Sequence, residues 1–109
     1  MKYFRFERVG SLIQGELNKI ILKEIETPGI LITITQVEVA KDLESAIVYF
    51  SAIPSVKAEE ALEILEKNRV HLQYLLMKKL NIKPMPKIFF KIDRGPEKAA
   101  QVEKALLDK

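Results

Sequence analysis

The segment ILITITQVEVAKDLESAIVYFSAI, residues 30–53, decides the fold. β-Branched residues dominate Ile30–Val39 and recur in Ser45–Ile53, so we predict two β-strands there. The five residues between them, Ala40–Glu44, form a short connection. We therefore expect the two strands to pair as an antiparallel hairpin.

The two predicted strands differ in how clearly they show a buried face. In the second strand Ala46, Val48 and Phe50 alternate with Ile47 and Tyr49. In the first strand, strict alternation places two sets of side chains on opposite faces of the sheet, and the sequence does not show which set is buried. One set is Thr33, Thr35, Val37 and Val39, and the other is Ile32, Ile34, Gln36 and Glu38.

Apolar residues recur at helical spacing on both sides of the hairpin. Upstream they predict a helix over Arg5–Ile25, which Thr27-Pro28-Gly29 ends. Glycine inside a helix costs about 1 kcal/mol of stability relative to alanine. The presence of Gly15 in this helix therefore suggests that another part of the chain packs closely against it. Downstream an apolar stripe over Lys57–Leu80 weakens at Asn68-Arg69, so we predict two helices that meet at a bend. We expect Asn68, a residue type that tolerates left-handed backbone, to relieve strain at this bend.

A third strand is predicted at Lys87–Asp93, after two prolines have ended the helical pattern. The order helix, strand, strand, helix, helix, strand predicts an α+β two-layer sandwich, with helices covering a three-stranded sheet. The helical crossover before the third strand favours parallel pairing, so the sheet should be mixed. We assign residues 1–95 to this domain and residues 96–109 to a short C-terminal tail that is weakly helical or disordered.

The composition leaves little equipment for catalysis. The 109-residue chain has no cysteine and a single histidine, His71, which argues against disulfides, thiol nucleophiles and multi-histidine metal centres. It contains no phosphate-binding loop, dinucleotide-binding fingerprint or nucleophile elbow. We therefore predict a non-enzymatic protein with no catalytic residues, cofactor, metal or small-molecule substrate. Because it shows no signal peptide or membrane-spanning stretch, we expect it to act in the cytoplasm and not at a membrane. We also expect it to be a monomer.

Charge is segregated along the chain, although the net charge is only +3. Asp42–Glu66 is acidic, whereas Lys67–Ile92 holds seven basic residues and no acid. Such a basic stretch is typical of a protein that binds phosphate backbones, and it also occurs where lysines merely keep a small domain soluble. The residues that we predict to contact RNA phosphates are Arg69, Lys78, Lys79, Lys83 and Lys87, with a smaller cluster at Arg5 and Arg8.

Three segments match one known family in their order and spacing. They are Arg8-Val9-x-x-x-Ile13-x-x-Glu16-Leu17-x-x-Ile20, Ile34-Thr35-x-Val37-Glu38-Val39-Ala40-Lys41-Asp42-Leu43-x-x-Ala46-x-Val48-Tyr49, and Leu72-x-x-Leu75-Leu76-x-Lys78-x-Leu80-x-Ile82-x-x-x-Pro86-x-Ile88-x-Phe90-x-x-Asp93. Together they extend over nearly the whole chain. The family that the chain resembles is bacterial ribosome-binding factor A.

This resemblance implies a type II KH-like fold and no catalytic activity. It implies binding to the immature small (30S) ribosomal subunit and a role in processing and maturing the 16S rRNA, typically in cold adaptation. It also implies a kink between two helices at Asn68, Arg69 and Val70, where the family has Ala-x-Gly. The family often has an arginine where this chain has Gln73, so we assign no phosphate contact to Gln73.

The sequence is also compatible with two other functions. One is a KH-like regulator that binds single-stranded RNA, which usually needs aromatic or apolar platforms for unstacked bases. The other is a protein-interaction module that uses the acidic face formed by Asp42–Glu66 to hold a basic partner.

Overall fold

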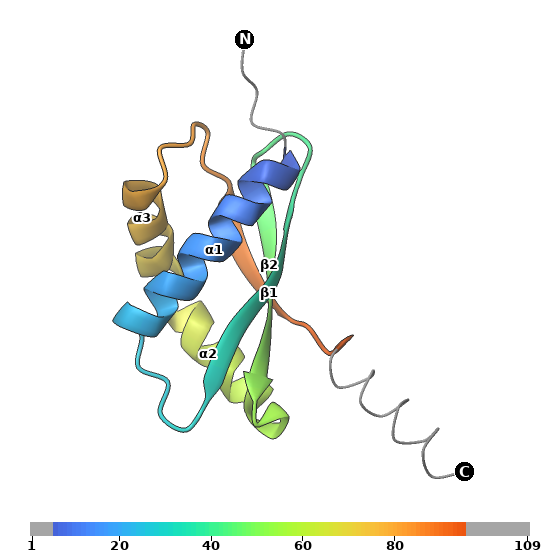
Figure 1. Cartoon of the computed structure of the whole chain (residues 1–109), viewed down its shortest axis with the longest axis vertical. Coiled ribbons are helices and arrows are strands. Elements are labelled where there is room, and N and C mark those ends of the chain that lie inside the picture. Colours follow the sequence, from blue (N-terminus) through green and yellow to red (C-terminus); the bar gives the residue numbers. More distant parts are fainter. Residues whose placement is uncertain (1–5, 96–109) are drawn as a thin grey trace, which may run out of the picture.

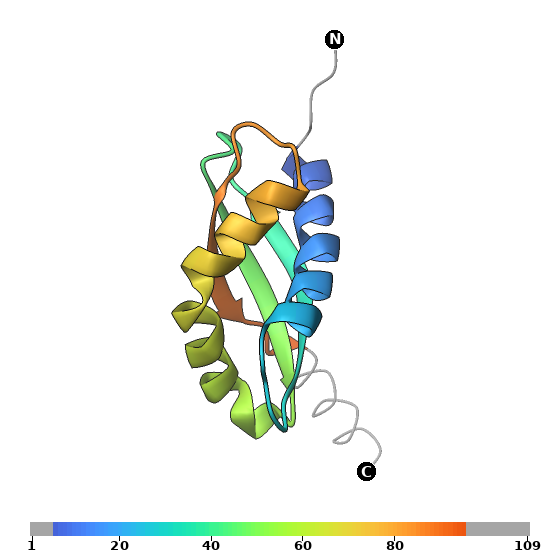
Figure 2. The ribbon, with the colours of Figure 1, turned by 90° about the vertical axis from the view of Figure 1, so that its left-hand side faces the viewer.

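The computed structural model describes residues 6–95 and places the helices on one face of a three-stranded sheet (Figures 1 and 2). The elements are α1 (Phe6–Glu24), β1 (Leu31–Val39), β2 (Ser45–Ile53), the short 3-10 helix η1 (Ser55–Lys57), α2 (Ala58–Lys67), α3 (Arg69–Lys79) and β3 (Lys87–Ile92). The predicted α+β two-layer sandwich and its predicted order of elements are confirmed, with the short helix η1 added before α2. The predicted tail, residues 96–109, lies outside the described residues.

The sheet is mixed and has the strand order β1-β2-β3. β1 and β2 pair antiparallel across the predicted hairpin, and β2 and β3 pair parallel. The parallel pairing follows from the crossover through α2 and α3, which returns the chain to the same end of the sheet. Both β1 and β3 are therefore edge strands.

A β-bulge at Thr35 changes which side chains of β1 face the helices. The pairing with β2 shifts between Ile34 and Gln36, so Thr35 is the extra residue. Ile34 and Val39 are both buried, although strict alternation assigned them to opposite faces. That expectation was wrong because one extra residue moves every later side chain of the strand to the other face.

Polar groups hold the bulge from both sides. On α1, the Asn18 Oδ1 accepts a hydrogen bond from the Ile34 amide (2.8 Å), and the Asn18 Nδ2 donates to the Ile34 carbonyl (3.2 Å). On the other side the Thr35 hydroxyl donates to the Asp93 Oδ2 (2.7 Å). The Asp93 amide donates to the carbonyl of Phe50 on β2 (2.7 Å). Asp93, the residue after β3, thus links all three strands.

The opposite edge of the sheet is held in the same way by α3. The Gln73 Nε2 donates to the Pro86 carbonyl, and the Gln73 Oε1 accepts from the Ile88 amide, each at 2.9 Å. The outward backbone groups of an edge strand lack a strand partner, and a side-chain amide can satisfy a donor and an acceptor together. Gln73 therefore has a structural role at the edge formed by β3.

One apolar core fills the space between the helices and the sheet. Among the described residues, no buried side-chain nitrogen or oxygen lacks a hydrogen-bond partner. The largest fully buried apolar side chains are Phe50, Ile13, Leu17, Ile34, Leu65, Leu72, Leu76 and Ile88.

The junction between α2 and α3 consists of Asn68 alone. Its backbone has φ −102° and ψ 8°, so it is not left-handed, and the expected use of that conformation does not occur. Instead the Asn68 Nδ2 donates a 2.8 Å hydrogen bond to the carbonyl of Ile64 in the last turn of α2. The same carbonyl also accepts the backbone N–H of Asn68 (3.2 Å), so the side chain adds a second hydrogen bond to the last turn of α2.

The close contact expected at Gly15 occurs at Gly10 instead. A Cβ atom added to Gly10 would lie 2.7 Å from the carbonyl oxygen of Val37, whereas one added to Gly15 would meet nothing within 4 Å. α1 therefore approaches the backbone of β1 just beyond the bulge, and only glycine leaves room for that approach.

These two glycines give a matched test of the packing. We expect Gly10→Ala to lower the free energy of unfolding by about 1–3 kcal/mol, since α1 must shift away from β1. Gly15→Ala should raise it by about 0.5–1 kcal/mol, because alanine is the better helix former and has space. Urea unfolding of both variants checks the pair, and a stabilised Gly10→Ala variant would contradict the close approach.

The carboxylate that links the strands should make stability depend on pH. The Thr35 hydroxyl, and then the Gly95 amide, hold the pKa of Asp93 below its ordinary value. The Asp93 carboxylate therefore binds a proton more readily in the unfolded chain than in the folded one. It stabilises the fold fully above a pH of about 4, and this contribution is lost as the pH falls through the lowered pKa of Asp93 in the folded chain.

We expect Asp93→Asn to be less stable than the native chain at neutral pH and to lose less stability on acidification. Urea unfolding from pH 7 to pH 2 measures both effects. Since the other carboxyl groups are shared by the two proteins, the difference between their curves isolates Asp93. Parallel curves would show that the carboxylate contributes nothing to the link.

Candidate nucleic-acid interface

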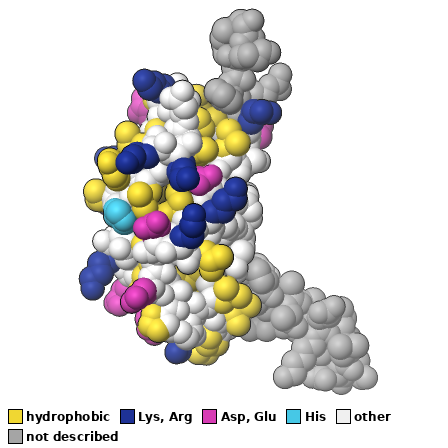
Figure 3. All heavy atoms as spheres, turned by 60° about the vertical axis from the view of Figure 1, so that its left-hand side comes forward, with side chains coloured by type: hydrophobic (Ala, Val, Ile, Leu, Met, Phe, Trp, Pro, Cys, Tyr) yellow, Lys and Arg dark blue, Asp and Glu magenta, His cyan; other side chains and the backbone are white. Residues whose placement is uncertain are grey.

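A groove between α1 and α3 brings together lysines that are far apart in the sequence. It encloses about 390 Å³. Figure 3 shows basic side chains gathered on the face that α3 and α1 share. We call it the α1–α3 groove, and its lining residues are Glu16, Lys19, Ile20, Lys23, Glu24, Leu75, Lys78 and Lys79.

Local sequence explains how each helix presents its lysines. On α1, Lys19 and Lys23 are four residues apart and so lie on the same side of the helix, while the neighbouring Ile20 is buried in the core. On α3, Lys78 and Lys79 occupy the last turn, where the negative end of the helix dipole favours cations. Both pairs are therefore placed by helices whose other sides are packed against the sheet.

The charges of the groove do not cancel. Four lysines face two glutamates, which leaves an excess of two positive charges. Within residues 6–95, none of the four lysines forms an ion pair. An excess of clustered cations over anions creates a positive potential that attracts a polyanion. The arrangement can bind phosphate groups, and nothing in it supplies a nucleophile activated by a base.

The other residues predicted to contact phosphates lie outside the groove. Lys83 is exposed in the loop after α3, and Arg8 is exposed near the start of α1. Figure 2 shows that this loop crosses the end of the molecule at which α1 begins. Lys87 is exposed at the start of β3, on the opposite sheet face from the buried Ile88. Arg5 lies outside the described residues.

Arg69 is already engaged inside the chain. Its Nε donates to the Glu66 Oε1 at 3.2 Å, and its guanidinium carbon lies 5.5 Å from the centre of the Phe89 ring. A cation over an aromatic face is stabilised by the ring quadrupole. Arg69 therefore bridges the start of α3, the end of α2 and β3, and phosphate would have to compete with these partners.

Lys19 and Lys23 were missed by the sequence analysis. They lie on α1 together with Glu16 and Glu24, and such a mixture of charges is typical of the solvent-exposed side of any amphipathic helix. The spacing of four residues was visible, but the pairing of α1 with α3 comes only from the tertiary structure.

The acidic residues of α2 lie apart from the groove. Glu59, Glu60, Glu63 and Glu66 are exposed on α2. The Arg94 Nη2 lies 3.1 Å from the Glu59 Oε2, and Arg69 pairs with Glu66. Two of the four carboxylates thus have cationic partners within the chain, which leaves less charge for a basic protein partner.

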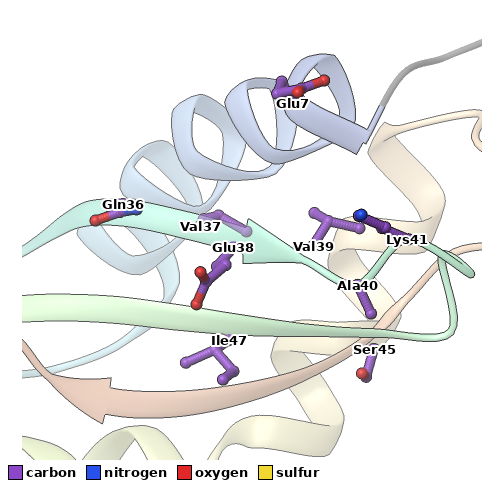
Figure 4. A pocket seen from close by; sticks show the side chains of 9 residues that line it. All are labelled: Glu7, Gln36, Val37, Glu38, Val39, Ala40, Lys41, Ser45 and Ile47. Carbon is purple, nitrogen blue, oxygen red and sulfur yellow. The ribbon is translucent and has the colours of Figure 1, made fainter.

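A second hollow, of about 500 Å³, lies between the first turn of α1 and the hairpin (Figure 4). It is larger than the α1–α3 groove, but its charged lining is mixed: Glu7, Glu38 and Lys41. The Tyr49 hydroxyl donates to the Glu38 Oε1 at 3.2 Å. Desolvation, and then this bond to Glu38, raise the pKa of Tyr49. The hollow has no excess of positive charge, so we favour the α1–α3 groove as the polyanion site.

In the part of the chain that the structure describes, no cluster of three His, Cys, Asp or Glu side chains could hold a metal ion. None of the helices described is both long enough and apolar enough to cross a bilayer.

Comparison with known proteins gives a consistent set of relatives. Residues 5–106 match the family model described as ribosome-binding factor A. The chain is 33% identical to ribosome-binding factor A of Fusobacterium nucleatum, with 99% of this chain and 98% of that protein covered. The crystal structure of ribosome-binding factor A from Thermus thermophilus has the same fold, with a TM-score of 0.74 at 22% identity, covering 84% of this chain and all of that one.

Another similar structure comes from a ribosomal complex. It is a homology model of Thermus thermophilus ribosome-binding factor A, as fitted into the cryo-EM map of a complex of that factor with the 30S subunit. It is 26% identical to this chain, with a TM-score of 0.60, and the match covers 75% of this chain and 92% of that one.

Proposed function

Because this chain belongs to the ribosome-binding factor A family, we propose that it binds the small ribosomal subunit through the α1–α3 groove. We propose further that it assists the processing and maturation of 16S rRNA without catalysing a reaction. The observation that supports the proposal most directly is the groove itself, in which four lysines face two glutamates. The 30S complex of the Thermus thermophilus relative makes the small subunit the partner to test.

The energy of binding would come from phosphate contacts. Each lysine that neutralises a phosphate releases condensed counterions, which favours association at low salt. Such contacts position a protein on RNA but carry no sequence information. Specificity would therefore come from the shape of the folded rRNA, which must present phosphates at the spacing of the lysines on α1 and α3.

A protein without catalytic groups can act only through differential affinity. If the chain binds one rRNA conformer more tightly than others, it shifts the population toward that conformer. We propose that it acts as a cytoplasmic monomer, with residues 1–95 as the RNA-binding domain. It would hold rRNA that has folded but has not yet reached its mature conformation. Rearrangement of stable RNA helices slows in the cold, so this action would contribute to cold adaptation.

Removing charge from the groove should weaken binding and flatten its salt dependence. We expect the triple variant Lys19→Gln, Lys23→Gln, Lys79→Gln to keep its melting temperature and to bind immature small subunits at least about tenfold more weakly. The logarithmic salt slope should fall by about 0.7–0.9 for each phosphate contact removed. Co-sedimentation with the subunits over a series of salt concentrations measures both quantities.

A matched control removes three lysines outside the groove, by Lys41→Gln, Lys67→Gln and Lys91→Gln. Both variants lower the net charge from +3 to 0, so they differ only in where the charge is lost. The control should retain most of the binding. Equal losses in both variants would mean that net charge, and not the groove, drives association. Loss of binding in a Glu59→Gln, Glu60→Gln, Glu63→Gln variant would instead point to the acidic face.

A further inference from the structure

α3 presents an exposed apolar stripe beside the groove. Val70, Tyr74 and Met77 are 75%, 55% and 55% exposed, respectively. Their spacing of four and then three residues places them on one side of the helix. The inward side of α3 is formed by Leu72 and Leu76, which are fully buried. The stripe is therefore not part of the core, and contiguous exposed apolar surface of this kind marks an interaction site.

Lys78 joins this stripe to the α1–α3 groove. Its Nζ lies 5.4 Å from the centre of the Tyr74 ring, and its side chain also lines the groove. Figure 3 shows hydrophobic side chains lying directly beside the basic ones on this face. The aromatic ring thus stands at the rim of the groove, next to a cation that can contact phosphate.

The charges around the stripe favour a nucleotide as its occupant. α3 contains three basic residues, Arg69, Lys78 and Lys79, and no acidic one. Surfaces that bind single-stranded nucleic acid combine cations for the backbone with aromatic rings on which bases stack. In a duplex the base faces are hidden by neighbouring bases, so only an unpaired nucleotide can offer its face to Tyr74.

We propose that an unpaired rRNA nucleotide stacks its base on Tyr74 while an adjacent phosphate contacts Lys78 at the rim of the groove. This inference rests on the proposed function and narrows its ligand from RNA in general to RNA with an unpaired nucleotide at the groove. Every base has a face that can stack, so the contact selects single-strandedness and not a particular sequence.

The chain has no tryptophan, which makes the proposal testable by fluorescence. The Tyr74→Trp variant carries a single indole at the predicted stacking position. Oligouridine and oligoadenosine should each quench its emission, whereas a fully paired RNA hairpin of equal length should not. Val56→Trp is the matched control, because Val56 is 87% exposed in η1 and does not line the groove. Its emission should change little with any of these RNAs.

Affinity gives a second, independent readout. Tyr74→Ala should weaken binding of fluorescently labelled oligouridine by about tenfold, whereas Tyr74→Phe, which keeps the ring, should stay within about twofold of the native chain. Because Tyr74 is exposed, both variants should melt like the native chain, and thermal unfolding checks this.

The possible outcomes separate this inference from the proposed function. If the native chain binds oligouridine but the emission of Y74W is unchanged and Tyr74→Ala binds normally, stacking is overturned while RNA binding stands. If the native chain binds neither RNA nor immature small subunits, the proposed function itself fails. If a polyglutamate peptide quenches Y74W and the RNAs do not, the stripe is a docking surface for acidic protein, which also overturns the proposal.

Discussion

The bulge at Thr35 is the constraint on which the arrangement of both layers depends. One extra residue in β1 turns Val37 and Val39 toward the helices, on the same side as Ile34. It also brings the β1 backbone so close to Gly10 that a Cβ there would be 2.7 Å from a carbonyl oxygen. α1 therefore lies close against β1, and the Asn18 side chain is paired to the backbone of Ile34.

The position of α1 then sets the geometry of the candidate site. α1 is held to the edge strand β1 by Asn18, and α3 is held to the other edge strand, β3, by Gln73. Each helix presents two lysines, so the sheet fixes the relative placement of all four through its two edges. Because the two helices are fixed to the sheet, binding a polyanion has to order the lysine side chains but not their backbones, which lowers the entropic cost of association.

Most of the fold was predictable because each element has a strong local pattern. The hairpin, the three main helices and the third strand follow from hydrophobic periodicity and from proline, which ends the helical pattern before β3. The bulge was not predictable, since an added Thr35 leaves the β-propensity of the strand unchanged. The importance of Gly10 and the membership of Lys19 and Lys23 in the groove were also hidden, because each depends on contacts between distant segments. Lys78 and Lys79 could be selected from sequence, since the charge run itself marks them.

The central claim, that the α1–α3 groove faces rRNA in the small subunit, is tested most directly by RNA cleavage from tethered probes. The chain has no cysteine, so an iron chelate that generates hydroxyl radicals can be attached at one introduced cysteine. Leu22→Cys places it on α1 beside Lys23, at a position that is 79% exposed, and Glu63→Cys places it on the acidic helix α2. We predict localised cleavage of 16S rRNA from position 22 and little from position 63. Cleavage from position 63 alone would contradict the account.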